Sequence, residues 1–293
     1  MASIEFDNRV AIITGAGAGL GRSHAIALAR RGVRVVASDI QSPDSVCDEI
    51  AALGGEAIAI AANVTDPAAV TTMVEKTIDR WGHIDILVNN AGILRDRSFA
   101  KMTLDEWRAV IDVHLTGSAI CTHAVWQHMR ERQYGRIVFT SSSSGLYGNF
   151  GQANYGAAKM GVIGLMNVLH LEGIAKGIHV NALSPVAATQ MTEGLMPEEA
   201  LAKLTPDSVS EGLVYLCCDA APARLILCAG AGSYGATRIF GTQGITLDER
   251  DRTAEQVAAR IADVVDSADQ EETVAGGEQT VRFLAQAGVE ITR

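Results

Sequence analysis

A strand, a glycine-rich turn and a helix open the chain, and this order constrains the fold more than any other feature. Residues 9–14, RVAIIT, are apolar and rich in β-formers, and the phrase TGAGAGLG follows from Thr14 to Gly21. A helical pattern then runs to about Arg31. In such a unit the backbone approaches a phosphate closely, and the helix N-terminus supplies N–H groups and positive dipole. A plain left-handed turn, which also favours glycine, is the alternative.

Apolar runs and helical patterns continue to alternate along most of the chain. After the first strand, further strands are predicted at 33–38, 57–62, 84–88, 136–140, 178–183 and 225–229. The predicted helices between them begin at recognisable caps, among them Asp66 before Pro67 and the capping boxes 103–106 and 208–211. This alternation predicts parallel βαβ units and one doubly wound α/β sheet of about seven strands.

Polar residues follow the ends of these predicted strands, where ligands bind in open α/β sheets. Asp39 closes the second strand, 18 residues after Gly21. A carboxylate there accepts hydrogen bonds from both hydroxyls of an adenosine ribose and repels a 2′-phosphate, which favours NAD over NADP. Asp39 could instead cap the next helix, although Asp44 stands closer to its start. Asn63 and Val64 follow the third strand, where an adenine ring would lie.

Residues 141–159, SSSSGLYGNFGQANYGAAK, place a serine, a tyrosine and a lysine after the fifth predicted strand. Tyr155 and Lys159 are four residues apart, so on a helix their Cβ atoms share one face about 5–6 Å apart. A free phenol has a pKa of about 10, and a neighbouring cation favours the phenolate. Ser142 precedes the tyrosine by 13 residues. These residues predict a proton-transfer site, with a core tyrosine and a surface lysine as the structural alternative.

Composition argues against several classes of protein. The formal net charge of −10 disfavours a nucleic-acid partner, since phosphate binding needs a basic surface. No apolar run approaches the roughly 20 residues of a membrane span, and residues 1–9 are too polar for a targeting signal. The seven histidines and five cysteines show no metal-ligand spacing. We therefore expect a cytoplasmic protein with reduced thiols and no metal.

Three motifs in this order resemble the short-chain dehydrogenase/reductase family. They are TGAGAGLG after the first strand, NNAG at residues 89–92, and Ser142 with Tyr155 and Lys159. The resemblance extends over about residues 6–240 and implies a Rossmann-type sheet with nicotinamide-dependent hydride transfer. It also implies that Tyr155 is the acid/base, that Lys159 binds the nicotinamide ribose and lowers the pKa of the tyrosine, and that Ser142 orients the substrate oxygen.

The resemblance assigns a cofactor site residue by residue. The candidate NAD-binding residues are Gly15, Gly19, Leu20, Gly21, Asp39, Asn63, Val64, Asn90, Ala91, Gly92, Tyr155, Lys159, Pro185, Ala188 and Thr189. His114 is the fourth candidate catalytic residue, because most of the family has there an asparagine that anchors a proton-relay water. A neutral imidazole can form the same hydrogen bonds, with a purely structural helix histidine as the alternative.

Two longer phrases resemble one subgroup of the family in particular. NNAGILRDRSFAKM and YGRIVFTSSSSGLYGNFGQANYGAAK are similar to the (3R)-hydroxyacyl-CoA dehydrogenase unit of type 2, D-specific peroxisomal multifunctional enzymes and to its stand-alone bacterial relatives. This implies oxidation of a (3R)-3-hydroxyacyl-CoA to the 3-ketoacyl-CoA in β-oxidation of fatty acids or steroid side chains. A dehydrogenase of hydroxysteroids or other free secondary alcohols is the first alternative. A catalytically silent NAD-binding protein is the second, although it has no need of the catalytic residues.

A basic trio follows the NNAG motif. Arg95, Arg97 and Lys101 could meet the phosphates of a CoA thioester at the mouth of the site, against the negative charge of the whole chain. The alternative is a solvated loop whose charges are balanced by Asp96 and Asp105.

The last 46 residues, 248–293, differ from the rest of the chain. They contain eleven acidic residues and five arginines, yet Val257, Ile261, Val264 and Val265 follow a helical period. A second short helix is predicted around Phe283, beyond a pair of glycines. We therefore expect a helical extension packed on the 1–247 domain or on a partner subunit, and not a disordered acidic arm.

The long helices predicted at 103–131 and 153–176 bear on assembly. They carry more apolar surface than one face of a sheet can cover, and the family pairs such helices across a two-fold axis. We therefore expect a homodimer or homotetramer that acts on a small-molecule substrate.

Overall fold

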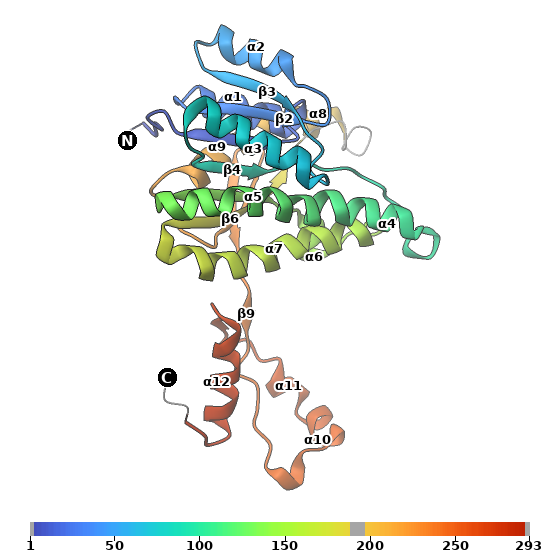
Figure 1. Cartoon of the computed structure of the whole chain (residues 1–293). Coiled ribbons are helices and arrows are strands. Elements are labelled where there is room, and N and C mark those ends of the chain that lie inside the picture. Colours follow the sequence, from blue (N-terminus) through green and yellow to red (C-terminus); the bar gives the residue numbers. More distant parts are fainter. Residues whose placement is uncertain (1–2, 188–196, 291–293) are drawn as a thin grey trace. The chain divides into compact units, whose positions relative to one another are not determined.

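The computed structural model describes residues 3–187 and 197–290, which form two compact units, Met1–Ala236 and Thr237–Arg293. The first unit contains one large sheet with helices on both faces (Figure 1). The second consists of short helices and a small two-stranded sheet. The division falls before residue 247, where the sequence placed a domain boundary, because the main sheet ends with a strand at 233–237.

Eight strands form the main sheet, in the order β3-β2-β1-β4-β5-β6-β7-β8. They are β1 (Val10–Thr14), β2 (Arg34–Asp39), β3 (Ala57–Ala61), β4 (Ile86–Asn89), β5 (Gly135–Thr140), β6 (Ile178–Val186), β7 (Ile226–Gly230) and β8 (Ser233–Thr237). All neighbouring strands from β3 to β7 pair in parallel, with Ile12 of β1 facing Val36 on one side and Leu87 on the other. This confirms the predicted Rossmann-type α/β fold.

The eighth strand was not predicted. It follows β7 after a two-residue turn, Ala231 and Gly232, in which both residues have positive φ, 52° and 74°. Two-residue turns of this kind join the strands of tight hairpins. Because short exposed runs such as SYGAT have no apolar alternation, the sequence offers little signal for this edge strand.

Two layers of helices cover the sheet. One layer is α1 (Gly19–Ala29), α2 (Asp44–Ala52) and α9 (Pro206–Cys217); the other is α3 (Pro67–Trp81), α5 (Gly117–Arg132) and α7 (Ala153–Gly173). Alternate strand residues face opposite layers, so Ile13 and Val88 pack in one core and Ile12 and Leu87 in the other. Shorter helices are α4 (Leu104–Ile111), α6 (Ser143–Tyr147) and α8 (Glu198–Lys203). A strand buried on both faces explains the continuous apolar runs of the sequence.

The long helix predicted from residue 103 contains a feature that the sequence did not reveal. Its capping box is confirmed, since the Thr103 hydroxyl accepts from the Glu106 N–H and the Glu106 carboxylate accepts from the Thr103 N–H. However, a π-helical turn, Asp112–Thr116, separates α4 from α5 and carries His114. Such turns widen the helix locally and often occur at functional sites.

The capping box predicted at residues 208–211 is wrong. α9 begins at Pro206, which suits the first helical position because it needs no N–H donor there. Ser208 and Ser210 lie inside the helix, and their hydroxyls donate to the carbonyl oxygens of Thr205 and Pro206. A serine hydroxyl inside a helix can donate to a carbonyl oxygen of the preceding turn. The sequence motif alone therefore did not determine where the helix begins.

The second unit contains α10 (Ala254–Ala259), α11 (Ile261–Val264), α12 (Gly276–Gln286) and the antiparallel pair β9 (Phe240–Gly241) and β10 (Glu271–Glu272). The apolar stripe predicted on one helix is broken at Arg260, whose φ and ψ of −112° and 18° end α10. The predicted helix around Phe283 is present as α12, and the glycine pair opens it. No helix in the described part of the chain is long and apolar enough to cross a bilayer.

Candidate functional site

A cavity of about 420 Å³ lies at the carboxyl ends of the parallel strands, within the size range of ligand pockets. The turn before α1, the ends of five strands, the π-helical turn and α7 contribute to its walls. Of the predicted site residues, it brings together Gly15, Gly19, Leu20, Gly21, Asp39, Asn63, Val64, Asn90, Ala91, Gly92, His114, Tyr155, Lys159 and Pro185. Ala188 and Thr189 lie outside the described residues.

Two glycines at the start of the cavity cannot carry a side chain. Gly15 has a φ of +66°, and a Cβ there would lie 2.8 Å from the Cα of Ala91. A Cβ on Gly21 would overlap the carbonyl oxygen of Gly15. The N-terminal end of α1 is therefore bare backbone, which is the surface that a pyrophosphate needs.

The glycine turn is tied to the end of β4. The Asn90 side-chain amide donates to the carbonyl oxygens of Thr14 and Gly15, both at 3.1 Å. The Thr14 hydroxyl accepts from the N–H groups of Asn90 and Ala91 at 3.0 and 3.1 Å. These bonds hold the two strand ends that frame the cavity at a fixed separation.

Asp39, the last residue of β2, also lines the cavity. One carboxylate oxygen accepts from the Gly17 N–H at 2.9 Å and the other from the Ile40 N–H at 2.7 Å. Each oxygen has a second lone pair, so the carboxylate can still accept from two ligand hydroxyls. The prediction that Asp39 might cap the next helix does not hold, because α2 begins at Asp44 without a side-chain cap.

The candidate catalytic pair lies on the first turns of α7. The Lys159 ammonium donates to the carbonyl oxygen of Thr140 at 2.6 Å and lies 5.5 Å from the centre of the Tyr155 ring. Ser142 stands outside the cavity lining and caps α6, where its hydroxyl accepts from the Ser144 N–H at 3.2 Å. The same hydroxyl hydrogen-bonds the Tyr155 phenol, so these three residues form one group.

Burial controls the charges of this pair. It lowers the pKa of Lys159 to about 7. It also raises the pKa of Tyr155; the Ser142 hydrogen bond acts in the opposite direction, and the charge of Asp96 adds to the rise. The net direction is therefore upward, because the loss of water around the phenol outweighs the Ser142 hydrogen bond, and the lowering expected from Lys159 stays a prediction.

His114 points from the π-helical turn into the same cavity. Its Nε2 lies 3.0 Å from the Ile93 N–H nitrogen and 2.8 Å from the Ile93 carbonyl oxygen, while its buried Nδ1 has no hydrogen-bond partner among the described residues. Its ring meets the Tyr155 ring edge-on, with centroids 5.1 Å apart. Burial, followed by the Lys159 charge, lowers the pKa of His114 to about 3, so the imidazole is neutral. A side chain on Gly92 would overlap this ring.

Several lining residues carried no signal in the sequence. They are Ala18, Ile40, Ala62, Ile93, Val113 and Thr140. Thr140 ends a strand, Ile40 and Ala62 directly follow one, and Ile93 follows the motif at residues 89–92. Their side chains are small or apolar and take part in no acid–base chemistry. Only the strand–turn–helix order could have identified them, since it predicts which backbone faces the ligand.

One residue of the basic trio, Arg97, forms an ion pair with an acidic side chain. Arg97 pairs with Glu106 at 3.0 Å, whereas Asp105 pairs with Arg108 and the Asp96 carboxylate accepts from Gln152. Within the described part of the chain, neither the Arg95 guanidinium nor the Lys101 ammonium forms an ion pair with an acidic side chain. Among the described residues Asp96 and Asp105 therefore form no ion pair with the trio, which does not support the alternative of a loop balanced by these two acids.

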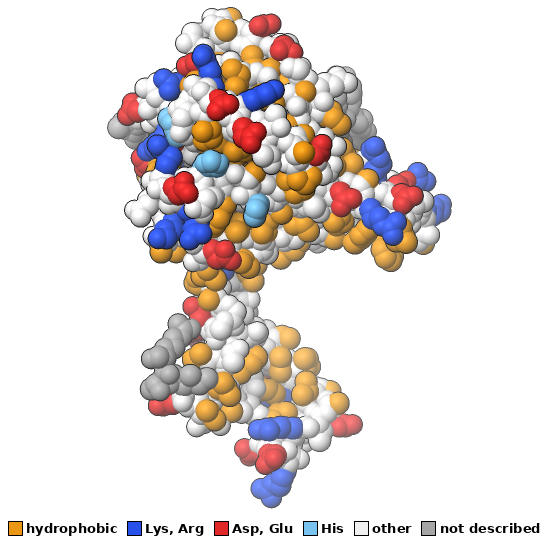
Figure 2. Space-filling view, in the orientation of Figure 1, with side chains coloured by type: hydrophobic (Ala, Val, Ile, Leu, Met, Phe, Trp, Pro, Cys, Tyr) orange, Lys and Arg blue, Asp and Glu red, His pale blue; other side chains and the backbone are white. Residues whose placement is uncertain are grey.

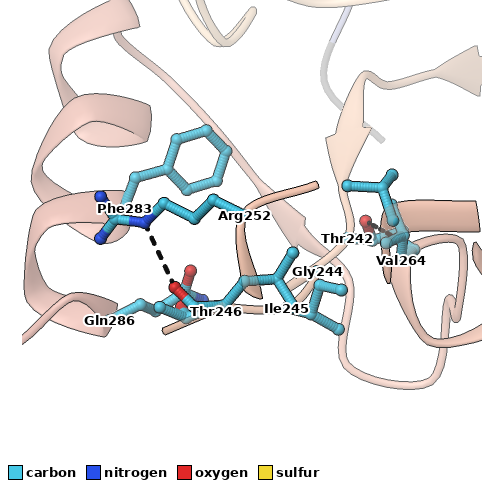
Figure 3. Close-up of a pocket in the computed structure, with 10 residues that line it drawn as sticks. Thr242, Gly244, Ile245, Thr246, Arg252, Val264, Phe283 and Gln286 are labelled. Carbon is cyan, nitrogen blue, oxygen red and sulfur yellow. Dashed lines mark hydrogen bonds between the residues drawn. The ribbon is translucent and has the colours of Figure 1, made fainter. Parts of the chain in front are cut away.

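The second unit contains a separate cavity, also of about 420 Å³, shown in Figure 3. Apolar residues dominate its lining, including Ile245, Val264 and Phe283, and Arg252 is its one ionisable residue. Arg252 donates to the carbonyl oxygen of Leu247 at 3.4 Å. Among the described residues that line this cavity, no Asp, Glu, His, Cys, Lys or Tyr accompanies the guanidinium. A smaller cavity of the same unit, about 260 Å³, is lined by Glu271, Glu272, Glu278 and Arg282. Among the described residues, no three His, Cys, Asp or Glu side chains gather as metal ligands.

The sheet, the bare glycine turn and the Ser–Tyr–Lys group together define a dinucleotide-dependent oxidoreductase site. The chain belongs to the short-chain dehydrogenase/reductase family, since the family model described as short chain dehydrogenase matches residues 9–200. A nicotinamide nucleotide cofactor follows from this membership.

Relatives of known name refine the comparison. The chain is 42% identical over 271 residues to a short-chain type dehydrogenase/reductase of Mycobacterium tuberculosis, covering 88% of this chain and 94% of that protein. It is 42% identical over 273 residues to the peroxisomal multifunctional enzyme type 2 of Mus musculus, covering 89% of this chain but 37% of that enzyme.

A solved structure is similar over nearly the whole chain. Full-length peroxisomal multifunctional enzyme type 2 from Drosophila melanogaster matches with a TM-score of 0.85 and 37% identity, over 98% of this chain and 51% of that one. The chain thus spans about half of this relative, or less in the mouse enzyme. The predicted resemblance to this subgroup is confirmed.

Proposed function

We propose that this protein is an NAD-dependent dehydrogenase that oxidises a (3R)-3-hydroxyacyl-CoA to the 3-ketoacyl-CoA, in β-oxidation of fatty acids or steroid side chains. The observation that carries this proposal is one cavity whose lining includes both Asp39 and Tyr155. The names of the multifunctional relatives support the choice of substrate.

The residues present fit a nicotinamide dinucleotide. The bare backbone between Gly15 and Gly21 would hold the pyrophosphate, and the free lone pairs of Asp39 would accept from the adenosine ribose. Because the same carboxylate repels a 2′-phosphate, NAD is preferred to NADP. Lys159 would bind the nicotinamide ribose, and Asn63 and Val64 the adenine. When bound, the nicotinamide ring supplies the hydride acceptor.

The chain's own residues handle the proton. Tyr155 takes the hydroxyl proton of the substrate, and Ser142, whose hydroxyl hydrogen-bonds the phenol, would hold the substrate oxygen. The phenolate form needs nearby positive charge, because burial alone disfavours it. The Lys159 ammonium lies on the same side of α7, 5.5 Å from the ring centre, and is the cation that the chain provides. General-base help of this kind typically accelerates a reaction by about 10²–10⁴-fold.

Two cations that follow the motif at residues 89–92 suit a CoA thioester. Arg95 and Lys101 follow the end of β4 and, unlike Arg97, form no ion pair with an acidic side chain in the described part of the chain. Their charge would attract the CoA phosphates locally although the chain as a whole carries −10.

The exposed apolar face of α7 bears on the assembly of the protein. α7 presents Met160, Val168 and Leu171 to solvent, 42%, 53% and 48% exposed, and Figure 2 shows apolar side chains on this face of the molecule. We propose that such a face pairs in a homodimer or homotetramer, and that residues 248–293 pack on the dehydrogenase domain or a partner subunit. A cytoplasmic location stays a prediction, although several relatives are named as peroxisomal.

A substrate panel tests the proposal. The whole chain is mixed with NAD⁺ and, in turn, (3R)- and (3S)-3-hydroxyacyl-CoA, the matching free hydroxy acid and a hydroxysteroid, and NADH formation is followed. We expect kcat/KM to be highest for the (3R) thioester. Better turnover of the hydroxysteroid would favour a free-alcohol dehydrogenase, and NAD⁺ binding without turnover of any alcohol would favour a silent binder.

A matched pair of variants tests the thioester itself. Arg95→Ala should raise KM for the CoA thioester with little change in kcat, the pattern of lost uniform binding, while Arg97→Ala should change less. A shortened thioester without the CoA nucleotide serves as control, because Arg95→Ala should leave its KM unchanged. Equal effects of Arg95→Ala on both thioesters would contradict the phosphate contact.

A further inference from the structure

The segment Gly92–Arg97, which leaves the end of β4, has no regular secondary structure and yet is fixed along its length. Its first residues line the cavity beside Tyr155, and His114 holds Ile93. An irregular segment has no hydrogen-bond ladder of its own, so its position depends on the groups that bond it. Those groups come mainly from the stretch that ends in the catalytic helix.

Asn154, the residue before Tyr155, makes the most buried of these contacts. It is fully buried, and its side-chain nitrogen donates to the carbonyl oxygens of Arg95 at 3.1 Å and Glu106 at 3.3 Å. Its side-chain oxygen accepts from the Tyr155 N–H at 2.8 Å. One amide therefore joins the segment, α4 and the first turn of the catalytic helix.

Gln152 makes a second contact, two residues earlier. Its side-chain nitrogen donates to the Asp96 carboxylate at 2.7 Å. Its oxygen accepts from the Ser144 hydroxyl at 2.7 Å and from the Asn149 side chain at 3.0 Å. The backbone adds a third contact, since the Arg97 N–H donates to the Gly151 carbonyl oxygen at 2.8 Å.

We propose that Asn154 and Gln152 are positioning residues, which fix the Gly92–Arg97 wall of the substrate site to the helix that carries Tyr155. The wall and the phenol then move as one body, and the distance between a bound substrate and its proton acceptor is set by this clamp. This role rests on the proposed function, because it presumes that a substrate lies between the wall and Tyr155.

The charges around the phenol agree with such a role. The Asp96 carboxylate is close enough to raise the pKa of Tyr155, while the Ser142 hydrogen bond lowers it. Other ionisable groups facing the phenol are Lys159 from its own helix and the neutral His114 from the π-helical turn. The Gln152 hydrogen bond fixes the position of the Asp96 carboxylate. Removing this bond should therefore also change the pH profile of turnover.

Asn154→Asp separates the wall contact from the helix contact. The aspartate keeps an oxygen for the Tyr155 N–H but loses both donors to the Arg95 and Glu106 carbonyl oxygens. We expect kcat/KM for the hydroxyacyl-CoA to fall about 10- to 100-fold, the cost of a small misplacement, with the NAD⁺ dissociation constant unchanged within about twofold. Unchanged kinetics, or a parallel loss of NAD⁺ affinity, would overturn the positioning role.

Gln152→Ala and Asn149→Ala form a matched pair at the surface. Both remove a partner from the same small network, but only Gln152 bonds the wall. Gln152→Ala should lower kcat/KM and shift the pH profile, whereas Asn149→Ala should leave both as in the parent. Equal effects of the two changes would contradict the proposal even if Asn154→Asp fails to fold.

Amide hydrogen exchange of the whole, substrate-free chain gives a readout that does not depend on activity. Exchange across residues 92–97 should be faster in Asn154→Asp and Gln152→Ala than in the parent or Asn149→Ala, and equal rates would overturn the clamp. If the parent oxidises no alcohol at all, the proposed function fails, and this measurement still decides whether the clamp exists.

Discussion

The two units of the chain bury their apolar side chains to different degrees. In Met1–Ala236, large residues such as Phe139 and Ile137 are completely buried between the sheet and its helices. In Thr237–Arg293 no described residue is buried, and Phe283 and Val265 are 51% and 63% exposed. The first unit therefore has a core of its own, while the second leaves an apolar surface that another surface would have to cover.

The two cavities show the same contrast. They are similar in volume, but one gathers a phenol, an ammonium, an imidazole and a carboxylate at the ends of buried strands, and the other contains one guanidinium. Ionisable groups keep a fixed geometry when rigid elements carry them. The difference teaches that cavity size alone does not identify a site, whereas the elements beneath it do.

Removing the cation from each cavity should give the largest difference. Lys159→Ala should lower turnover by about 10²–10⁴-fold and also weaken NAD⁺ binding, because the ammonium serves both the phenol and the ribose. Arg252→Ala, in the second unit, is the matched control and should leave both quantities unchanged. A loss of turnover with Arg252→Ala as large as with Lys159→Ala would break the contrast.

Replacing one phenylalanine in each unit by alanine should sharpen the contrast in burial between the two units. Phe139→Ala should lower the free energy of unfolding by about 3–5 kcal/mol, as for other fully buried rings. Phe283→Ala should cost more than about 1 kcal/mol if the proposed packing covers the exposed half of the ring, and less otherwise. Denaturant unfolding measures both, and light scattering shows whether a partner subunit provides the cover. A neutral Phe283→Ala would contradict the proposed packing.

The preference for NAD over NADP tests the role of Asp39 at the end of β2. Asp39→Ala removes the carboxylate that would repel a 2′-phosphate, so the ratio of NAD⁺ to NADP⁺ affinity should fall by about tenfold, the worth of roughly 1.4 kcal/mol. Titration of both nucleotides into parent and variant measures it. Tighter NADP⁺ than NAD⁺ binding by the parent would remove the role given to Asp39.

A pH effect on stability should also belong to the first unit, since the sequence after residue 236 contains no histidine. Burial lowers the pKa of His24 to about 3, whereas the unfolded chain takes up its proton near the ordinary value of 6.5. The unfolded state therefore binds more protons below that value, and stability falls as the pH falls from about 6.5.

A substitution isolates this histidine. His24→Leu should lose about 1–2 kcal/mol less stability than the parent between pH 7 and pH 5, because one imidazole no longer titrates only in the unfolded state. Denaturant unfolding at the two pH values measures the difference. Parallel losses in parent and variant would show that His24 is not kept neutral by the fold.

The sequence predicted the sheet and the strand-end residues well, for a physical reason. Strands buried on both faces read as apolar runs, and ligand residues follow the strand ends directly, so both are local signals. The π-helical turn under His114 has no such signal, since its backbone differs from an α-helix by one extra residue. The helix break at Arg260 also has no signal in the sequence, because the apolar period of the helix continues through it.

The clamp on the Gly92–Arg97 segment was also beyond the sequence. Asn154 meets the Arg95 carbonyl oxygen across 59 residues, and Gln152 meets Asp96 across 56. Contacts so distant in the chain depend on how α4, α7 and the end of β4 pack. The burial that raises the pKa of Tyr155 is likewise a property of the packed structure, so the sequence could not reveal it.

The most direct test of the central claim, that Tyr155 is the proton acceptor of an NAD-dependent oxidation, is Tyr155→Phe. The change removes one hydroxyl and keeps the ring that meets His114 edge-on. NAD⁺ affinity and NADH formation from (3R)-3-hydroxyacyl-CoA are measured on the same preparation. The account predicts an almost unchanged dissociation constant with turnover lower by at least about 10²-fold. Turnover within a few-fold of the parent would contradict it.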